Sequence, residues 1–170
     1  MNKIFDWILL NSPEHIKLSL YPKSIDKIFS RDFISKIDQE DIYRTSAGLS
    51  VYRKDVLRDL LREGESAWDF EIYGTSRSRK YSNFYTVNKE VIKVVNGVVR
   101  GKSNYHSLNI LKNLGIVIQS SSRPKMGRLE AIGAKLSILK GRLLYFFPPT
   151  IRKSLMNINW KVRGVNYRWM

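Results

Sequence analysis

An acidic pair beside a tryptophan is the part of the sequence best suited to acid–base chemistry. Asp69 and Glu71 follow Trp68 within the stretch Trp-Asp-Phe-Glu. A carboxylate can accept a proton from a hydroxyl group, and an indole ring offers a flat apolar surface for a ligand. Ser66 precedes Asp69 at the spacing of a helix capping box, which gives Asp69 a structural role. Glu71 is therefore the better candidate for a proton acceptor, ahead of Asp69.

Three basic residues have the chemistry to bind phosphate. Arg77 and Arg79 follow the acidic pair closely, and Lys102 lies further along the chain beside a glycine. Guanidinium groups pair well with phosphate oxygens, so these side chains could contact a diphosphate leaving group. All of these residues also have ordinary interpretations. Glu71 suits an exposed helix acid, Trp68 suits the hydrophobic core, and the basic side chains suit a solvated surface.

Composition limits the other kinds of site. The 170 residues can form a domain with a hydrophobic core, and they include no cysteine, which excludes disulfides, thiolate catalysis and Cys-based zinc sites. With only two histidines, His15 and His106, a His-rich metal site is also disfavoured. Residues 1–10 do not resemble a signal peptide, and no window has the roughly 18 apolar residues that would cross a bilayer. We expect a cytoplasmic protein, either soluble or peripheral to a membrane.

The charge of the chain is concentrated in its second part. Residues 1–99 hold 16 Lys and Arg against 14 Asp and Glu, a net charge of +2, whereas residues 100–170 hold 14 against one, a net charge of +13. This asymmetry indicates a surface that meets an anionic partner.

The basic part also has the pattern of an amphipathic helix. Apolar residues recur there at mostly three- and four-residue spacing: Leu129, Ile132, Leu136, Leu139 and Leu143. Basic residues alternate with Trp, Tyr and Phe beyond residue 149, a composition typical of segments in a membrane interface. We expect an anionic membrane surface as partner. A core-packing helix with a solvated basic face is the ordinary alternative, and nucleic acid is disfavoured because no known nucleic-acid-binding motif occurs.

Apolar periodicity predicts a mixed α/β fold, with a basic helical extension from about residue 126. Helices are expected over residues 3–10, 54–62, 104–114 and 128–143, from Ser66 onward, and in part over 24–37. Strands are expected over residues 16–20, 84–87, 91–99 and 116–118, and a strand or bend over 47–52. In the first strand Lys17 and Ser19 alternate with apolar residues.

Five stretches, in this order and spacing, resemble bacterial glycosyltransferase-like proteins of polysaccharide synthesis. The stretches are Ala47–Leu57, Trp68–Glu71, Gly74–Ser78, Asn96–Lys102 and Ser121–Met126, and the resemblance covers roughly residues 16–126. The chain is similar to the acceptor-side, C-terminal part of a GT-A-type glycosyltransferase. In inverting members of that group an acidic residue acts as the base, and the resemblance implies that it lies within Trp68–Glu71. On this resemblance we expect Glu71, ahead of Asp69, to take the proton of a sugar hydroxyl, and Trp68 to bind substrate by stacking on a sugar ring.

The resemblance also implies a donor-binding half with an Asp-x-Asp element that holds Mg²⁺ or Mn²⁺. This sequence has no Asp-x-Asp, and its nearest acidic group, Asp38–Asp41, is better interpreted as a loop or helix end. Because the resemblance begins near Met1, we expect a truncated protein without the donor-binding half, and no cofactor bound by this chain. The expected organisation is a partial GT-A-like domain over residues 1–126 and a basic amphipathic tail over 127–170.

The expected function is transfer of a sugar from a nucleotide sugar to a glycan or lipid-linked acceptor, at the inner face of a bacterial membrane. Two other classes stay open. One is a basic nucleic-acid-binding domain, whose affinity would depend on salt. The other is a non-catalytic interaction protein descended from the enzyme family.

Overall fold

The chain forms two compact units, each described here by itself. The computed structural model describes residues 2–20, 33–92, 94–95, 97–99, 101–116, 123–144 and 146–162. The first unit comprises residues 1–92 and 145–170, and the second comprises residues 93–144. The unit boundaries fall after residues 92 and 144, whereas the expected division into a glycosyltransferase-like domain and a basic tail lies at residue 126 and stays a prediction.

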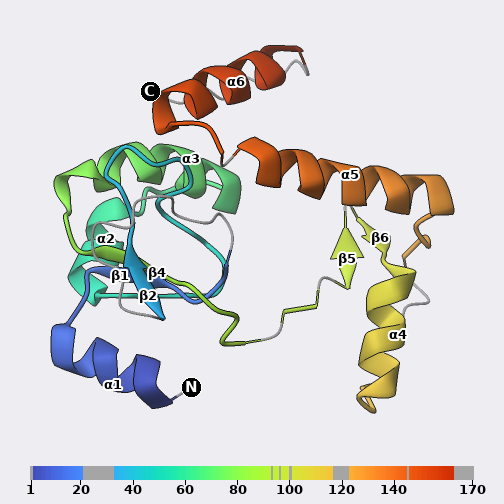
Figure 1. Cartoon of the computed structure of the whole chain (residues 1–170), viewed down its shortest axis with the longest axis horizontal. Helices are drawn as coiled ribbons and strands as arrows, with labels where there is room; N and C mark the ends of the chain where they lie inside the picture. Colours follow the sequence, from blue (N-terminus) through green and yellow to red (C-terminus); the bar gives the residue numbers. More distant parts are fainter. Residues whose placement is uncertain are drawn as a thin grey trace. The chain divides into compact units, whose positions relative to one another are not determined.

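A four-stranded mixed sheet organises the first unit (Figure 1). Its strands are β1 (His15–Lys17), β2 (Ile34–Lys36), β3 (Ser50–Tyr52) and β4 (Phe84–Val87), in the order β2-β4-β1-β3. Strand β1 runs parallel to β4 and antiparallel to β3, and β2 runs antiparallel to β4. The helices are α1 (Asn2–Asn11), α2 (Lys54–Leu60), α3 (Ala67–Arg77), the short 3-10 helix η1 (Ser78–Lys80) and α6 (Pro149–Val162). The expected mixed α/β class is confirmed.

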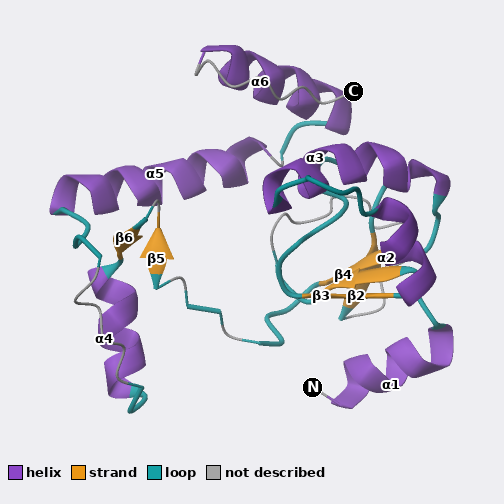
Figure 2. Cartoon of the chain, turned by 180° about the vertical axis from the view of Figure 1, so that it is seen from behind, coloured by secondary structure: helices purple, strands orange, loops and turns teal. Residues whose placement is uncertain are grey.

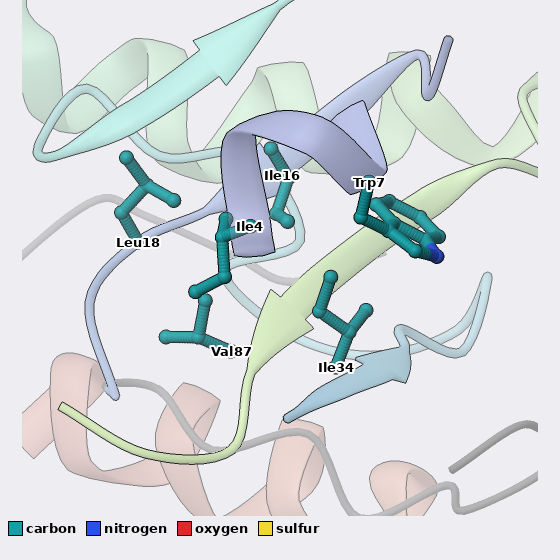
Figure 3. Close-up of a cluster of buried hydrophobic side chains, with 6 residues drawn as sticks. All are labelled: Ile4, Trp7, Ile16, Leu18, Ile34 and Val87. Carbon is teal, nitrogen blue, oxygen red and sulfur yellow. The ribbon is translucent and has the colours of Figure 1, made fainter. Parts of the chain in front are cut away.

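Helix α1 covers one face of this sheet. Its apolar side chains Ile4 and Trp7 pack against Ile16 and Leu18 from β1 and the residues just after it, together with Ile34 and Val87 (Figure 3). All six are buried. Burial of apolar area of this kind is the main force that holds a helix on a sheet.

Helices α2 and α3 cover the opposite face (Figure 2). Val56 and Leu60 from α2 and Phe70 from α3 form a second buried cluster with Ile37 and Phe84. Helix α3 begins where the capping box was predicted: Asp69 N–H donates to Ser66 Oγ at 3.2 Å, and Ser66 N–H donates to Asp69 Oδ2 at 2.8 Å. These two bonds satisfy amide groups that the first helical turn leaves without partners.

Helix α6 packs on the first unit beside α3. Met156 lies against the buried side chains of Ile42 and Ile72. Arg152, which is fully buried, forms an ion pair with Asp41 at 2.7 Å, and Lys153 forms one with Glu40 at 2.7 Å. The part of the expected basic tail that forms α6 is therefore joined to the loop between β2 and β3.

The second unit contains a short hairpin and two helices. Strands β5 (Val98–Val99) and β6 (Lys102–Ser103) pair antiparallel, and Gly101 in the turn has a φ of +76°. Helix α4 (Tyr105–Asn113) follows directly, and helix α5 (Arg128–Leu144) is the expected basic helix. Among the described residues, no helix is long and apolar enough to cross a bilayer.

Three expected elements differ from the structure. Residues 34–36 form strand β2 although a partly helical segment was expected over 24–37, because they pair with β4. Val91 and Ile92 are not in a strand, and neither is Ile116. Residues 24–32 of the expected partly helical segment and residues 117–118 of the last expected strand lie outside the described part of the chain.

Candidate functional site

The side chain of Glu71 is fixed by the loop that precedes β3. Its Oε1 atom accepts a hydrogen bond from the backbone N–H of Ala47 at 2.9 Å and a longer one from Ser46 Oγ at 3.4 Å. The Tyr52 hydroxyl in turn holds Ser46, accepting from its N–H at 2.9 Å and donating to its carbonyl oxygen at 3.0 Å. The carboxylate is half-buried and has a defined orientation, as a general base requires.

Trp68 lies one helical turn before Glu71, so the two residues share a face of α3. The side chain of Trp68 is 60% exposed, which shows that the core-packing interpretation was wrong. Its ring meets the edge of the Tyr43 ring, with centroids 6.5 Å apart and an interplanar angle of 65°. An exposed indole braced by a second aromatic ring offers a flat apolar surface next to a carboxylate.

The loop between β2 and β3 contains a backbone conformation that is rare outside glycine. Tyr43 has a φ of +51°, and conformations of this kind persist only where surrounding contacts enforce them. The ammonium group of Lys17 donates a hydrogen bond to the Tyr43 carbonyl oxygen. On the other side, Thr45 Oγ1 donates to the carbonyl of Phe70 in α3 at 3.1 Å. The loop that carries the partners of Glu71 is thus held from both the sheet and the helix.

Burial and nearby carboxylates shift the pKa values of Lys17 and Tyr43, the two residues joined at this loop. Complete burial lowers the pKa of Lys17 to about 8, although the carboxylates of Asp41 and Glu71 favour its charged form. Burial, with a contribution from the negative charge of Glu71, raises the pKa of Tyr43 to about 12. Glu71 therefore lies within electrostatic reach of the buried Lys17 ammonium and of the phenols of Tyr43 and Tyr52, which keep their protons at neutral pH.

A buried imidazole and guanidinium lie on the same face of the sheet as Lys17. The His15 ring stacks on Tyr52 at 4.0 Å between centroids and lies 4.8 Å from the Phe84 ring. The guanidinium carbon of Arg44 lies 4.2 Å from the centroid of Phe84, and its Nη2 donates to the Tyr81 carbonyl at 2.6 Å. Burial, and the positive charges nearby, lower the pKa of His15 well below its usual value, so the ring is neutral.

The other predicted site residues are engaged in ion pairs or caps. Asp69 is exposed for part of its surface and accepts the capping hydrogen bonds of Ser66. Arg77 pairs with Glu65 at 2.6 Å and donates to the Leu60 carbonyl at 2.8 Å, which ties α3 to the end of α2. These contacts give Asp69 and Arg77 structural roles, and their expected substrate contacts stay predictions.

Arg79 and Lys102 lie in different units of the chain. Arg79 pairs with Glu40 at 3.2 Å in the first unit. Lys102 pairs with Glu130 in the second unit. The structure places Trp68, Asp69, Glu71 and Arg77 on α3, where only Trp68 and Glu71 among these four are described as sharing a face, and Lys102 belongs to the second unit.

The described residues do not fit a divalent metal. Within these parts of the chain, no three His, Asp or Glu side chains gather where they could hold a cation. The acidic stretch at residues 38–41 forms a turn whose members point to separate partners, with Asp41 on Arg152 and Glu40 on Lys153. No step is therefore assigned to a metal ion.

Sequence reasoning missed the buried charges of this unit. Lys17, Asp41, Arg44 and Arg152 are each at most 3% exposed. The alternation of Lys17 with apolar residues predicted a strand but not the burial of the lysine, which follows because β1 is an inner strand covered on both faces. The pairing of Asp41 with Arg152 joins residues 111 positions apart, and no local pattern signals it.

Comparison of the chain with protein families, with curated proteins and with solved structures finds no match.

Proposed function

We propose that this chain binds a glycan acceptor and supplies the general base for transfer of a sugar from a nucleotide sugar. The observation that carries the proposal is the position of Glu71. Its half-buried carboxylate is oriented by Ala47 N–H at 2.9 Å, one helical turn from the exposed indole of Trp68. A fixed carboxylate beside an exposed aromatic ring is what activation of a sugar hydroxyl needs.

In the proposed reaction an acceptor sugar stacks on Trp68 and presents one hydroxyl to Glu71. The carboxylate takes the proton of this hydroxyl while its oxygen bonds to the anomeric carbon of the donor. The bond between that carbon and the phosphate oxygen breaks, and the nucleoside diphosphate leaves with the electron pair. The hydrogen bonds from Ala47 and Ser46 both go to Oε1, so Oε2 is the atom that takes the proton.

The proposal extends to the setting of the reaction. The acceptor is a growing, lipid-linked glycan of bacterial surface polysaccharide synthesis, and the chain is peripheral at the inner leaflet. Support comes from the resemblance of residues 16–126 to GT-A-type glycosyltransferases and from the net charge of +13 over residues 100–170.

A glycan-binding measurement tests the acceptor part of the proposal. Wild type, Trp68→Ala and Leu61→Ala are applied to an array of bacterial capsule and O-antigen oligosaccharides. Leu61 is the matched control, because it is an apolar side chain of the same unit that is 49% exposed. We expect wild type and Leu61→Ala to bind the same glycans, and Trp68→Ala to bind them about tenfold more weakly because a stacking ring is lost. Absence of wild-type binding, or equal binding by Trp68→Ala, would contradict the proposal.

A further inference from the structure

Helix α5 carries a continuous apolar stripe that its own unit leaves uncovered. Five apolar residues on one helical face are each more than half exposed, with exposed fractions between 52% and 85%. They are Leu129, Ile132, Leu136, Leu139 and Leu143. Exposed apolar surface that is contiguous along a helix marks a surface for association.

Basic residues border this stripe. Arg128, Lys135 and Arg142 recur every seven residues, so the helical repeat places these positions along one edge, and Lys140 is placed at the other. Helix α5 has four basic residues and one acid, a net charge of +3. The acid, Glu130, is already paired with Lys102 of β6. An apolar stripe with cationic borders is complementary to a surface that is apolar inside and anionic outside.

Two of the basic residues of helix α6 are described in ion pairs with the first unit. The helix has three basic residues and no acid over Pro149–Val162. Arg152 is fully buried in its pair with Asp41, and Met156 packs on Ile42 and Ile72. Helix α6 is thus docked on protein, even though Ile158 and Val162 near its end are 60% and 83% exposed.

We propose that α5 is the membrane-binding element of this chain and lies in the interface of an anionic phospholipid bilayer. The five apolar side chains enter the acyl boundary, and the basic residues at the borders of the stripe contact headgroup phosphates. Helix α6 stays docked on the first unit in the bound state. This inference deepens the membrane part of the proposed function, on which it rests, and it is independent of the role of Glu71.

Vesicle sedimentation with paired variants tests this assignment on the full chain. Vesicles contain either phosphatidylcholine alone or equal parts of phosphatidylcholine and phosphatidylglycerol. The α5 variant is Ile132→Ala with Leu136→Ala, and the matched α6 variant is Ile158→Ala with Val162→Ala. All four side chains are at least 55% exposed, so both variants should keep the far-ultraviolet circular dichroism of wild type. We expect the α5 variant to bind anionic vesicles about tenfold more weakly, and the α6 variant to bind within about twofold of wild type.

A single-cysteine label gives a second readout, because the chain has no cysteine of its own. Leu136→Cys and Ile158→Cys are each labelled with an environment-sensitive dye. With anionic vesicles, emission from position 136 should shift to the blue, and emission from position 158 should not change. A shift at position 158 alone would overturn the assignment of α5.

The remaining outcomes separate other partners of α5 from lipid. Equal pelleting with both kinds of vesicle, or none with either, would overturn the proposal. If the α5 variant instead changes the wild-type oligomeric state without lipid, α5 binds a second copy. If wild type binds nucleic acid at low salt but does not pellet with vesicles, and the α5 variant loses the nucleic-acid binding, α5 is a nucleic-acid surface. Glu71→Gln should pellet like wild type, so failure of the sugar chemistry leaves this test unaffected.

Discussion

Arg152 and Asp41 form a buried ion pair across 111 positions of the sequence. The Nη1 atom of Arg152 lies 2.7 Å from Oδ1 of Asp41, and their side chains are 0% and 4% exposed. The pair joins helix α6 to the loop that continues to Ser46 and Ala47, the residues that bind Glu71. Burial raises the pKa of Asp41, and the charge of Arg152 acts against that rise. The final helix therefore contributes to the frame of the candidate site.

Removing one partner of this pair should be costly. Arg152→Met leaves the Asp41 carboxylate buried without its guanidinium, and we expect the free energy of unfolding to fall by about 3–5 kcal/mol. Urea unfolding followed by circular dichroism measures the loss. The double variant Arg152→Met with Asp41→Leu should recover most of the stability, because no buried charge is left alone. Equal losses in the single and double variants would show that packing, rather than charge, dominates.

The neutral state of His15 predicts a stability that falls in acid. In the native protein burial, followed by the charges of Lys17 and Arg44, lowers the pKa of His15 well below its ordinary value of 6.5. Below pH 6.5 the unfolded chain binds a proton that the native chain does not. The free energy of unfolding should therefore drop by up to about 1.4 kcal/mol per pH unit.

The His15→Phe variant isolates this contribution. A phenyl ring can occupy the stack between Tyr52 and Phe84 without a group that titrates. Thermal unfolding at pH 5.5 and pH 7.5 should differ less for His15→Phe than for wild type. The same change at the other histidine, His106→Phe, should keep the wild-type difference. If His15→Phe and wild type lose equal stability in acid, His15 is not the group responsible.

The lowered pKa of Lys17 predicts that the free energy of unfolding rises with pH in the alkaline range. Its pKa is about 8 in the native protein against an ordinary value of 10.5, so between these values the unfolded chain holds the extra proton. The free energy of unfolding should increase with pH in this window, by at most about 1.4 kcal/mol per unit. Urea midpoints at pH 7.5 and pH 9.5 measure the slope. Lys17→Met should have a smaller slope than wild type, whereas Lys54→Met, a change at an exposed lysine, should keep it. Equal slopes for all three proteins would contradict the assignment.

Trp7 and Trp68, both in the first unit, should differ sharply in their effect on stability. Trp7 is 6% exposed in the cluster under α1, and Trp68 is 60% exposed on α3. We expect Trp7→Ala to lower the free energy of unfolding by about 3–5 kcal/mol, because it leaves a cavity in the core. Trp68→Ala should lower it by less than about 1 kcal/mol. A large loss at Trp68 would indicate a structural role and would weaken its assignment to acceptor binding.

Local signals predicted the parts of this fold that depend on neighbours in sequence. The start of α3 follows from Ser66 and Asp69, whose capping bonds form within one turn. Strand β4 and helix α5 follow from their apolar spacing. Residues 34–36 were not predicted as a strand because their conformation depends on pairing with β4, some 50 residues further along the chain.

The candidate site was predicted only in part for the same reason. The stretch Trp68–Glu71 identified the face of α3 that carries an exposed ring and a fixed carboxylate. Two hydrogen bonds hold the loop that fixes Glu71. Lys17 of strand β1 donates to a carbonyl oxygen of the loop, and Thr45 of the loop donates to a carbonyl oxygen of α3. These contacts arise from the packing of separate elements, so they cannot be predicted from composition or periodicity.

The rate of sugar transfer by Glu71→Gln tests the central claim most directly. The amide side chain of this variant would keep an oxygen for the Ala47 N–H bond, but it could not accept the proton of a sugar hydroxyl. Wild type, Glu71→Gln and the exposed control Glu63→Gln are assayed with labelled nucleotide sugars and lipid-linked glycan acceptors. The account predicts transfer by wild type and by Glu63→Gln, a result that would also overturn the expectation of a truncated chain. It predicts a rate about a hundredfold lower for Glu71→Gln with unchanged acceptor binding. Wild-type rates from Glu71→Gln, or no transfer by any of the three proteins, would contradict it.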